Sequence, residues 1–173
     1  MINKWQPISI EQLVDFIEEF AANRSRIDWA WIIFYWISQN IRYDTNAHFS
    51  DRIGEKTAKD VFQTGKATCE GYSELYAQLC VRTGRPCRKI NRYAKGHNFN
   101  SRQTSFNKRN HTWNALALND GQLYFVDSTW GSGHLHVTTL QYEAQLMPRF
   151  FSMSTRTYDL GNCLQIRWQW NNF

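Results

Sequence analysis

The 173-residue sequence predicts an α+β fold, with helices in the first half of the chain and antiparallel strands in the second. Up to about residue 83, apolar residues recur three and four positions apart, as on the buried face of a helix. From residue 87 on, apolar and polar residues alternate, and Asn119-Asp120-Gly121 between two such runs indicates a β-hairpin. Helices and strands grouped in separate parts of a chain are typical of this class.

Three helices are predicted before the centre of the chain. The first begins after Ser9, a residue type that caps helix N-termini, and shows one apolar face, formed by Leu13, Phe16, Ile17 and Phe20. The second covers about residues 28 to 40 and is apolar around most of its circumference, which predicts a central, buried position. Thr57, with Asp60 three residues later, indicates a short third helix. Residues 43–55 are polar and are expected to form a loop.

A fourth helix begins at or just after Cys69, which follows the turn-like residues Thr64, Gly65 and Lys66. It ends near Gly84 and shows apolar residues at helical spacing, namely Tyr72, Leu75, Tyr76, Leu79 and Cys80. Unpaired N–H groups and the positive end of the dipole at a helix N-terminus stabilise a thiolate and favour an oxyanion nearby. Cys69 is therefore a candidate nucleophile.

His111 and Asp127 are the candidate partners of Cys69. His111 opens an alternating strand, and Asp127 closes the next one. A two-residue hairpin loop would place these side chains on opposite faces of the sheet. A three-residue loop would place Trp113 opposite Asp127 and bring His111 onto the same face, roughly 7 Å away along the diagonal. A cysteine–histidine–aspartate triad therefore requires the odd-length loop or a bulge. The simpler alternative for Asp127 is that it caps the turn that follows it.

Several further residues are candidates for the same site. The side-chain donor of an oxyanion hole, acting beside the Cys69 N–H, has three candidates: Gln63, Trp36 and Gln39. Aromatic residues expected to line a substrate cleft, or else to pack in the core, are Trp113, Trp130 and Tyr72. His134 and His136 are an alternative base or a metal pair. No Cys-x-x-Cys or carboxylate stands at metal-ligand spacing, so neither a metal nor another cofactor is expected. The remaining cysteines are expected in the core or in strands: Cys80, Cys87 and Cys163.

Four motifs, in this order, resemble the transglutaminase-like superfamily, and most closely its branch around kyphoscoliosis peptidase. They are Cys69-Glu-Gly-Tyr-Ser, Tyr93-Ala-Lys-Gly, His111-Thr-Trp-Asn and Val126-Asp-Ser-Thr-Trp-Gly-Ser-Gly-His. The segment from Trp36 to Asp44 is similar to the helix that precedes the catalytic region in that branch. The resemblance covers about residues 28–136 of a domain expected to span 1–173, and the C-terminal part departs from the family pattern.

The resemblance implies a papain-like core, with N-terminal helices packed on an antiparallel sheet and the nucleophile at a helix N-terminus. It implies Cys69, His111 and Asp127 as a triad that forms an acyl-enzyme on a protein or peptide amide, without a cofactor. Water would resolve this intermediate in a peptidase and an amine in a transglutaminase. The nearest branch favours a peptidase and a cytoskeletal partner. The alternative from a different class is a non-catalytic binding module with a cytoskeletal or scaffold role.

Composition and charge indicate where the protein is located and which class of partner it binds. No apolar run is long enough to span a membrane, and the N-terminus has no apolar signal region, so a cytoplasmic location is expected. The net charge is +5, and the stretch between Glu74 and Asp120 contains basic residues but no acidic one. A solvated basic face or a preference for an acidic partner explains this run better than nucleic-acid binding does, because no stacking platform or groove-reading helix accompanies it.

Overall fold

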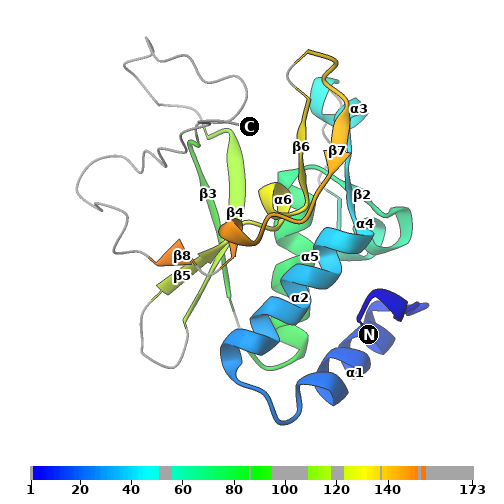
Figure 1. Ribbon diagram of the computed structural model, residues 1–173, viewed down its shortest axis with the longest axis vertical. Coiled ribbons are helices and arrows are strands. Elements are labelled where there is room, and N and C mark those ends of the chain that lie inside the picture. Colours follow the sequence, from blue (N-terminus) through cyan, green and yellow to red (C-terminus); the bar gives the residue numbers. More distant parts are fainter. Residues whose placement is uncertain are drawn as a thin grey trace.

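The computed structural model describes residues 2–50, 56–85, 87–94, 109–117, 123–136, 138–151 and 153–154. The helices and 3-10 turns are η1 (Ile2–Lys4), α1 (Ile10–Ala21), α2 (Arg26–Asn40), α3 (Thr45–Phe49), α4 (Ala58–Thr64), α5 (Cys69–Arg82), α6 (Ser128–Gly131) and η2 (Pro148–Phe150). The strands are β1 (Arg42–Tyr43), β2 (Lys66–Ala67), β3 (Arg88–Arg92), β4 (His111–Ala117), β5 (Leu123–Val126), β6 (Gly133–Leu135), β7 (Tyr142–Ala144) and β8 (Met153–Ser154). Helices occupy one side of the molecule and the larger sheet the other, which confirms the α+β prediction (Figure 1).

The N-terminal helices begin at capping residues. At α1 the Ser9 hydroxyl accepts a hydrogen bond from the Gln12 N–H, as predicted. Helix α2 starts at Arg26, slightly earlier than expected, because Ser25 and Asp28 form a reciprocal capping box there. The apolar run therefore lies in a helix whose N-terminal N–H groups are hydrogen-bonded by polar side chains.

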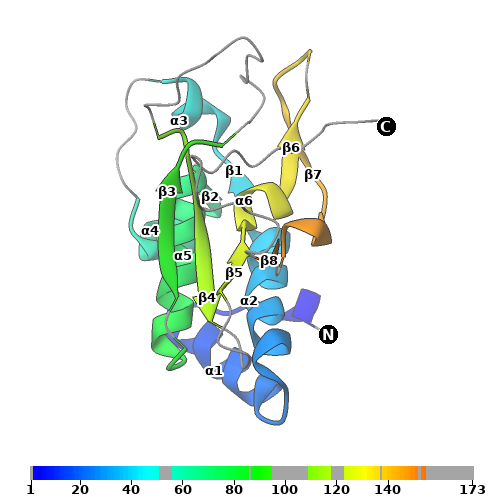
Figure 2. The ribbon, with the colours of Figure 1, turned by 90° about the vertical axis from the view of Figure 1, so that its left-hand side faces the viewer.

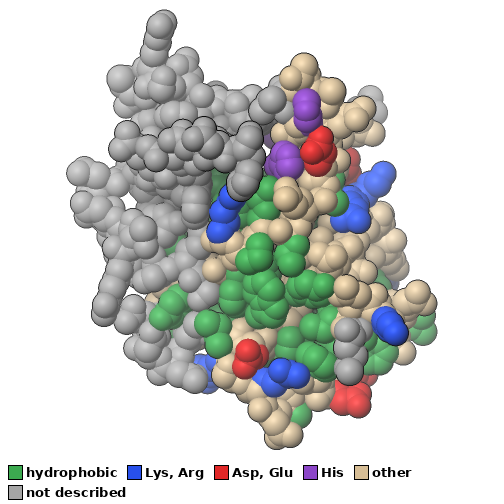
Figure 3. Space-filling model, viewed as in Figure 1, with side chains coloured by type: hydrophobic (Ala, Val, Ile, Leu, Met, Phe, Trp, Pro, Cys, Tyr) green, Lys and Arg blue, Asp and Glu red, His purple; other side chains and the backbone are tan. Residues whose placement is uncertain are grey.

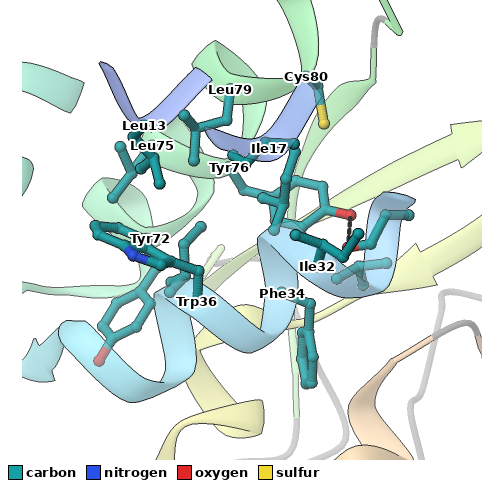
Figure 4. Close-up of a cluster of buried hydrophobic side chains, with 14 of the residues drawn as sticks. Leu13, Ile17, Ile32, Phe34, Trp36, Tyr72, Leu75, Tyr76, Leu79 and Cys80 are labelled. Carbon is teal, nitrogen blue, oxygen red and sulfur yellow. Dashed lines mark hydrogen bonds between the residues drawn. The ribbon is translucent and has the colours of Figure 1, made fainter. Parts of the chain in front are cut away.

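Helix α5 is the centre of the molecule. Its apolar face packs against α1 and α2, and these helices bury one continuous cluster of large side chains (Figure 4). Leu75, Tyr76 and Leu79 are fully buried, and the Tyr76 hydroxyl donates to the Ala30 carbonyl at 3.2 Å. Burying one such side chain contributes roughly 1.5–3 kcal/mol. The helix that carries Cys69 is thus held along its length by apolar contacts.

A four-stranded antiparallel sheet, in the order β3-β4-β5-β8, covers the opposite face of α5 (Figure 2). Strand β4 is central to it and is buried over nearly its whole length. Four residues form a second, smaller apolar cluster there: Ala94, Trp113, Ala115 and Phe125. The alternate residues of β4 face α5: Thr112 donates to the Glu70 carboxylate and Asn114 to the Ser73 carbonyl. His111 at the start of the strand therefore lies near the start of the helix.

Two segments differ from the prediction. The expected loop after Tyr43 contains helix α3, because the Asp44 carboxylate accepts from the Ala47 N–H and caps it. The expected turn from Gly131 to His134 instead contains the end of α6 and strand β6, which pairs with β7. Both differences involve short elements, α3 of five residues and β6 of three, which carry little periodicity in the sequence.

The molecular surface shows further features. No helix in the described ranges is long and apolar enough to cross a membrane. Hydrophobic side chains gather in the middle of the face that carries α2, and histidine side chains lie above them, beside the β6–β7 hairpin (Figure 3). Of the other cysteines, Cys80 is buried in the main core and Cys87 is half-buried against it, as expected, whereas Cys163 lies outside the described residues.

Candidate active site

Cys69 is the first residue of helix α5, and its side chain is half-buried. The chain reaches it through Gly65, which ends α4 in a left-handed conformation with φ of 62°. Thr68 is the N-cap residue, but its side chain makes no capping hydrogen bond. The first backbone N–H groups of a helix have no partner within it. Cys69 therefore lies at the electropositive end of α5, beside N–H donors that no cap occupies.

Gly71, in the Cys-Glu-Gly motif, allows α5 to approach α4 closely. A Cβ atom at this position would lie 2.9 Å from both Ala67 Cβ and Val61 Cγ2. Both neighbours are fully buried and have little room to move. The glycine two residues after the cysteine is thus required for the packing that fixes the start of α5.

His111 and Asp127 meet on one face of the sheet. Asn114 pairs with Val126, which is the register that a three-residue loop requires, while the loop itself, residues 118–122, lies outside the described part of the chain. His111 Nε2 lies 2.6 Å from Asp127 Oδ2, and the two side chains are only 7% and 4% exposed. Hydrogen bonds between a carboxylate and a charged donor are short and strong. The bond occupies Nε2, so the other ring nitrogen, Nδ1, is not used in the contact with Asp127.

The two carboxylate oxygens of Asp127 have different partners. Oδ2 binds His111, and Oδ1 accepts a hydrogen bond of 3.0 Å from the Trp130 N–H. Through this second bond Asp127 caps helix α6. Asp127 therefore caps α6, as the simpler interpretation predicted, and binds the His111 ring at the same time. The cap also fixes the orientation of the carboxylate toward the imidazole.

The protonation of His111 depends on its two charged neighbours. Burial lowers the pKa of His111, but the charge and hydrogen bond of Asp127 and the nearby Cys69 side chain outweigh this effect and raise it to about 10. Burial also raises the pKa of Tyr43, and the charges of Cys69 and Asp127 add to the rise. The structure thus brings Cys69, His111 and Asp127 together, with Tyr43 beside them.

Two tryptophan rings stack with His111. The ring of Trp130 lies 4.3 Å from the imidazole, centroid to centroid, at an interplanar angle of 13°. Trp113 lies at 5.8 Å and 28°. Trp130 is half-buried and lines a cavity, whereas Trp113 is 1% exposed and belongs to the apolar cluster of the sheet. Trp130 can therefore meet a ligand, and Trp113 supports the histidine from within.

The other predicted site residues lie elsewhere. Tyr72 is fully buried, and its hydroxyl donates to the Ile41 carbonyl at 2.8 Å, so it offers no surface to a substrate. Trp36 is buried and stacked on Phe62, and its Nε1 has no hydrogen-bond partner among the described residues. Gln63 is exposed on α4, and Gln39 is half-buried on α2.

The other two histidines that the sequence singled out, His134 and His136, are held by other groups. His134 Nε2 lies 3.4 Å from Glu143 Oε2, and His136 Nδ1 accepts hydrogen bonds from the N–H groups of Thr138 and Thr139. Within the described ranges, no group of three or more His, Cys, Asp or Glu residues could hold a metal ion.

A cavity of about 160 Å³ adjoins His111, and its lining includes Trp130 and His134 together with three aromatic residues that the sequence pattern did not single out. Tyr43, Tyr142 and Phe150 belong to three separate elements, so no local signal could have grouped them. Glu70, the neighbour of Cys69 in the chain, was missed for the same reason: its Oε2 accepts a hydrogen bond of 2.8 Å from Thr112, the neighbour of His111.

Comparison with known proteins agrees with this geometry. A family model of the transglutaminase-like superfamily matches residues 15–128. The chain belongs to the transglutaminase-like superfamily. Mouse (Mus musculus) kyphoscoliosis peptidase is 34% identical over 133 residues, 76% of this chain and 19% of that protein, and the human (Homo sapiens) protein is 33% identical over 135 residues, 77% and 20%. The chain thus spans about a fifth of the length of these relatives.

Solved structures show that the fold is shared with other members of this superfamily and with cysteine proteases. The crystal structure of a TGase matches 88% of this chain and 39% of its own, with a TM-score of 0.56 and 18% identity. A putative cysteine protease from Cytophaga hutchinsonii matches 69% of this chain and 37% of its own, with a TM-score of 0.50 and 17% identity. The predicted transglutaminase-like, papain-like core is therefore confirmed as the fold.

Proposed function

We propose that this protein is a cysteine-dependent acyl-transfer enzyme that acts on protein or peptide amides, with hydrolysis favoured over transamidation. Cys69 is the nucleophile, His111 exchanges protons with the reacting groups, and Asp127 orients and charges the histidine. One observation carries the proposal: the buried 2.6 Å hydrogen bond between His111 and Asp127 beside a half-buried cysteine at a helix N-terminus. A nucleophile, a base and an orienting carboxylate in this order are the requirements of covalent acyl transfer.

The first half of the reaction forms a thioester. Because the pKa of His111 is raised to about 10, the imidazole carries a proton at neutral pH. The Cys69 thiolate attacks the amide carbonyl carbon, and the electron pair of the C=O bond moves to its oxygen. The first-turn N–H groups of α5 stabilise this oxyanion. The C–N bond then breaks, and His111 donates its proton to the leaving nitrogen.

The second half resolves the thioester. His111, now neutral, accepts a proton from a water molecule, whose oxygen attacks the acyl carbon and releases the Cys69 thiolate and a carboxylic acid. A primary amine in place of water would give transamidation instead. One observation favours water: the relatives that this chain matches are named peptidases.

The proposal is tested by alkylation with iodoacetamide, read separately for each cysteine by mass spectrometry across a pH series. Only the thiolate reacts, so we expect Cys69 to be alkylated at about pH 6 much faster than a free peptide thiol. His111→Ala should remove this advantage, whereas Cys80, which is buried, should stay slow in both proteins. An ordinary pH profile for Cys69 in the wild type would contradict the proposal and would favour a non-catalytic binding module.

The same preparations then separate the two acyl acceptors. We expect the wild type to cleave casein and Cys69→Ser to be inactive. Incorporation of a fluorescent primary amine into casein, without cleavage, would instead assign transamidation.

A further inference from the structure

The cavity beside His111 has walls from several elements that are distant in sequence. Six residues with large aromatic or aliphatic side chains are among those that line it: Tyr43, Trp130, Leu135, Tyr142, Met147 and Phe150. No Lys, Arg, Asp or Glu occurs among the described residues that line it. A cavity with such walls favours an uncharged apolar group.

Several polar atoms in these walls already have partners, whereas Thr129 Oγ1 has no hydrogen-bond partner among the described residues. The Tyr43 hydroxyl lies 3.0 Å from His48 Nδ1, and the Tyr142 hydroxyl donates to the Ser132 carbonyl at 2.7 Å. The Asn110 side chain donates to the Ala94 carbonyl and accepts from its N–H. These groups are already hydrogen-bonded within the protein, so a ligand is recognised mainly by shape and apolar contact.

The size of the cavity indicates what it can hold. Its volume is about 160 Å³. A buried apolar cavity of about 150 Å³ binds benzene, whereas sites for whole drug-sized ligands measure about 300–1,000 Å³. The cavity therefore fits one large side chain, such as a phenyl ring, and not a whole small-molecule ligand.

Its position links the cavity to the reacting groups. His111 and Trp130, whose rings stack at 4.3 Å, are both part of the wall. Tyr43 lies in the wall and close to Cys69 and Asp127, since their charges act on its hydroxyl. Cys69 is not among the described lining residues, so a side chain held in the cavity would lie beside His111, the partner of the nucleophile.

We propose that this cavity is a substrate subsite for one large uncharged side chain, aromatic above all, of the polypeptide whose amide Cys69 attacks. The inference rests on the proposed function. Aromatic rings on Trp130, Phe150 and Tyr142 offer edge and face contacts to such a ring. A Lys side chain would lose its hydration there without finding a carboxylate among the described lining residues.

The experiment uses short peptidyl chloromethyl ketones, which alkylate an active-site thiol and differ at one of the two residues nearest the reactive group. We expect Cys69 to be labelled more than about tenfold faster with Phe than with Ala at one of these positions, and most slowly with Lys. Leu135→Trp should fill the cavity and abolish the preference, and Met147→Ala should enlarge it and favour Trp over Phe. Leu123→Trp, at an exposed leucine of β5, is the matched control.

Failure of the subsite proposal can be distinguished from failure of the proposed function. Equal labelling by all reagents, or faster labelling with Lys or Glu, alongside His111-dependent alkylation by iodoacetamide would overturn the subsite and leave the proposed function intact. Loss of the His111 dependence itself would end both proposals.

A separate observation concerns how Cys69 and His111 are held together. Glu70, next to Cys69, accepts a hydrogen bond of 2.8 Å from the Thr112 hydroxyl, next to His111. Lys89 on β3 binds the same carboxylate at 2.7 Å and also binds Glu74 at 2.8 Å. These contacts tie the first turns of α5 to two strands of the sheet, directly beside the reacting residues.

The geometry also points to Glu70 and Thr112 as positioning residues that set the separation of the Cys69 sulfur from the His111 ring. This second inference likewise rests on the proposed function. Thr112→Val removes the hydroxyl at similar volume, and Thr112→Ser retains it. We expect the valine variant to lose most of the low-pH alkylation advantage of Cys69 and the serine variant to keep it. A pH profile that is the same for valine, serine and wild type, with only thermal stability changed, would show that the contact is merely structural.

Discussion

The two roles of Asp127 can be separated by a pair of substitutions. Asp127→Asn retains a side-chain oxygen that can accept from the Trp130 N–H, so the cap of α6 survives. It replaces the charged oxygen toward His111 with an amide N–H₂. Asp127→Ala removes both interactions and leaves the buried imidazole without its partner.

The expected costs follow from these contacts. Removing one partner of a buried charged pair costs about 3–5 kcal/mol, and loss of an N-cap costs about 0.5–2 kcal/mol. Asp127→Ala should therefore lower the free energy of unfolding by roughly 4–7 kcal/mol. Asp127→Asn should cost only about 1–3 kcal/mol, because a neutral His111 can accept a hydrogen bond from the new amide.

Reactivity should behave differently from stability. Without the carboxylate, burial dominates and the pKa of His111 falls. The imidazolium that pairs with the Cys69 thiolate is then lost near neutral pH, so both variants should lose the low-pH alkylation advantage.

Urea denaturation and the alkylation profile measure these two quantities on the same preparations. Equal destabilisation by Asn and Ala would refute the cap assignment. An unchanged alkylation profile in Asp127→Asn would refute the argument that this carboxylate keeps His111 protonated.

Three further predictions follow from the same contacts. Gly131→Ala would place a Cβ atom 2.3 Å from the buried Phe34 ring, and we expect a loss of about 1–3 kcal/mol or more, measured by urea denaturation. Tyr72→Phe leaves the Ile41 carbonyl without the hydroxyl that donates to it and should cost about 1–3 kcal/mol, seen as a lower thermal midpoint. The folded-state pKa of His111 is raised from 6.5 to about 10, so its stabilising contribution should be complete below about pH 6.5 and lost as the pH rises toward 10. The difference in unfolding free energy between wild type and His111→Gln should shrink over that range, and a difference that grows would contradict this sign.

Local signals predicted most of the helices and the central hairpin. Ser9 and Thr57 mark helix starts because a hydroxyl at an N-cap satisfies a first-turn N–H regardless of the rest of the fold. The same holds for the apolar spacing of α5, where Leu75 and Leu79 are buried as predicted. Short elements such as α3 and β6 were missed, because a few residues carry too little periodicity to be recognised.

For the candidate site too, some features were predictable from neighbouring residues in the chain and others were not. The sequence by itself determined that Cys69 begins a helix and that His111 and Asp127 flank a hairpin, because both statements depend on neighbours in the chain. The hairpin register, on which the meeting of His111 and Asp127 depends, stayed open between two loop lengths until strand pairing decided it.

Only the tertiary structure decided what surrounds these residues. The cavity beside His111 and the link from Glu70 to Thr112 join residues that are far apart in the chain. Tyr72 follows Cys69 by three residues, yet it lies in the core, because the helix turns that face toward Ile41. Side-chain contacts across elements depend on how helices and sheet pack, and no periodicity within one element contains that information.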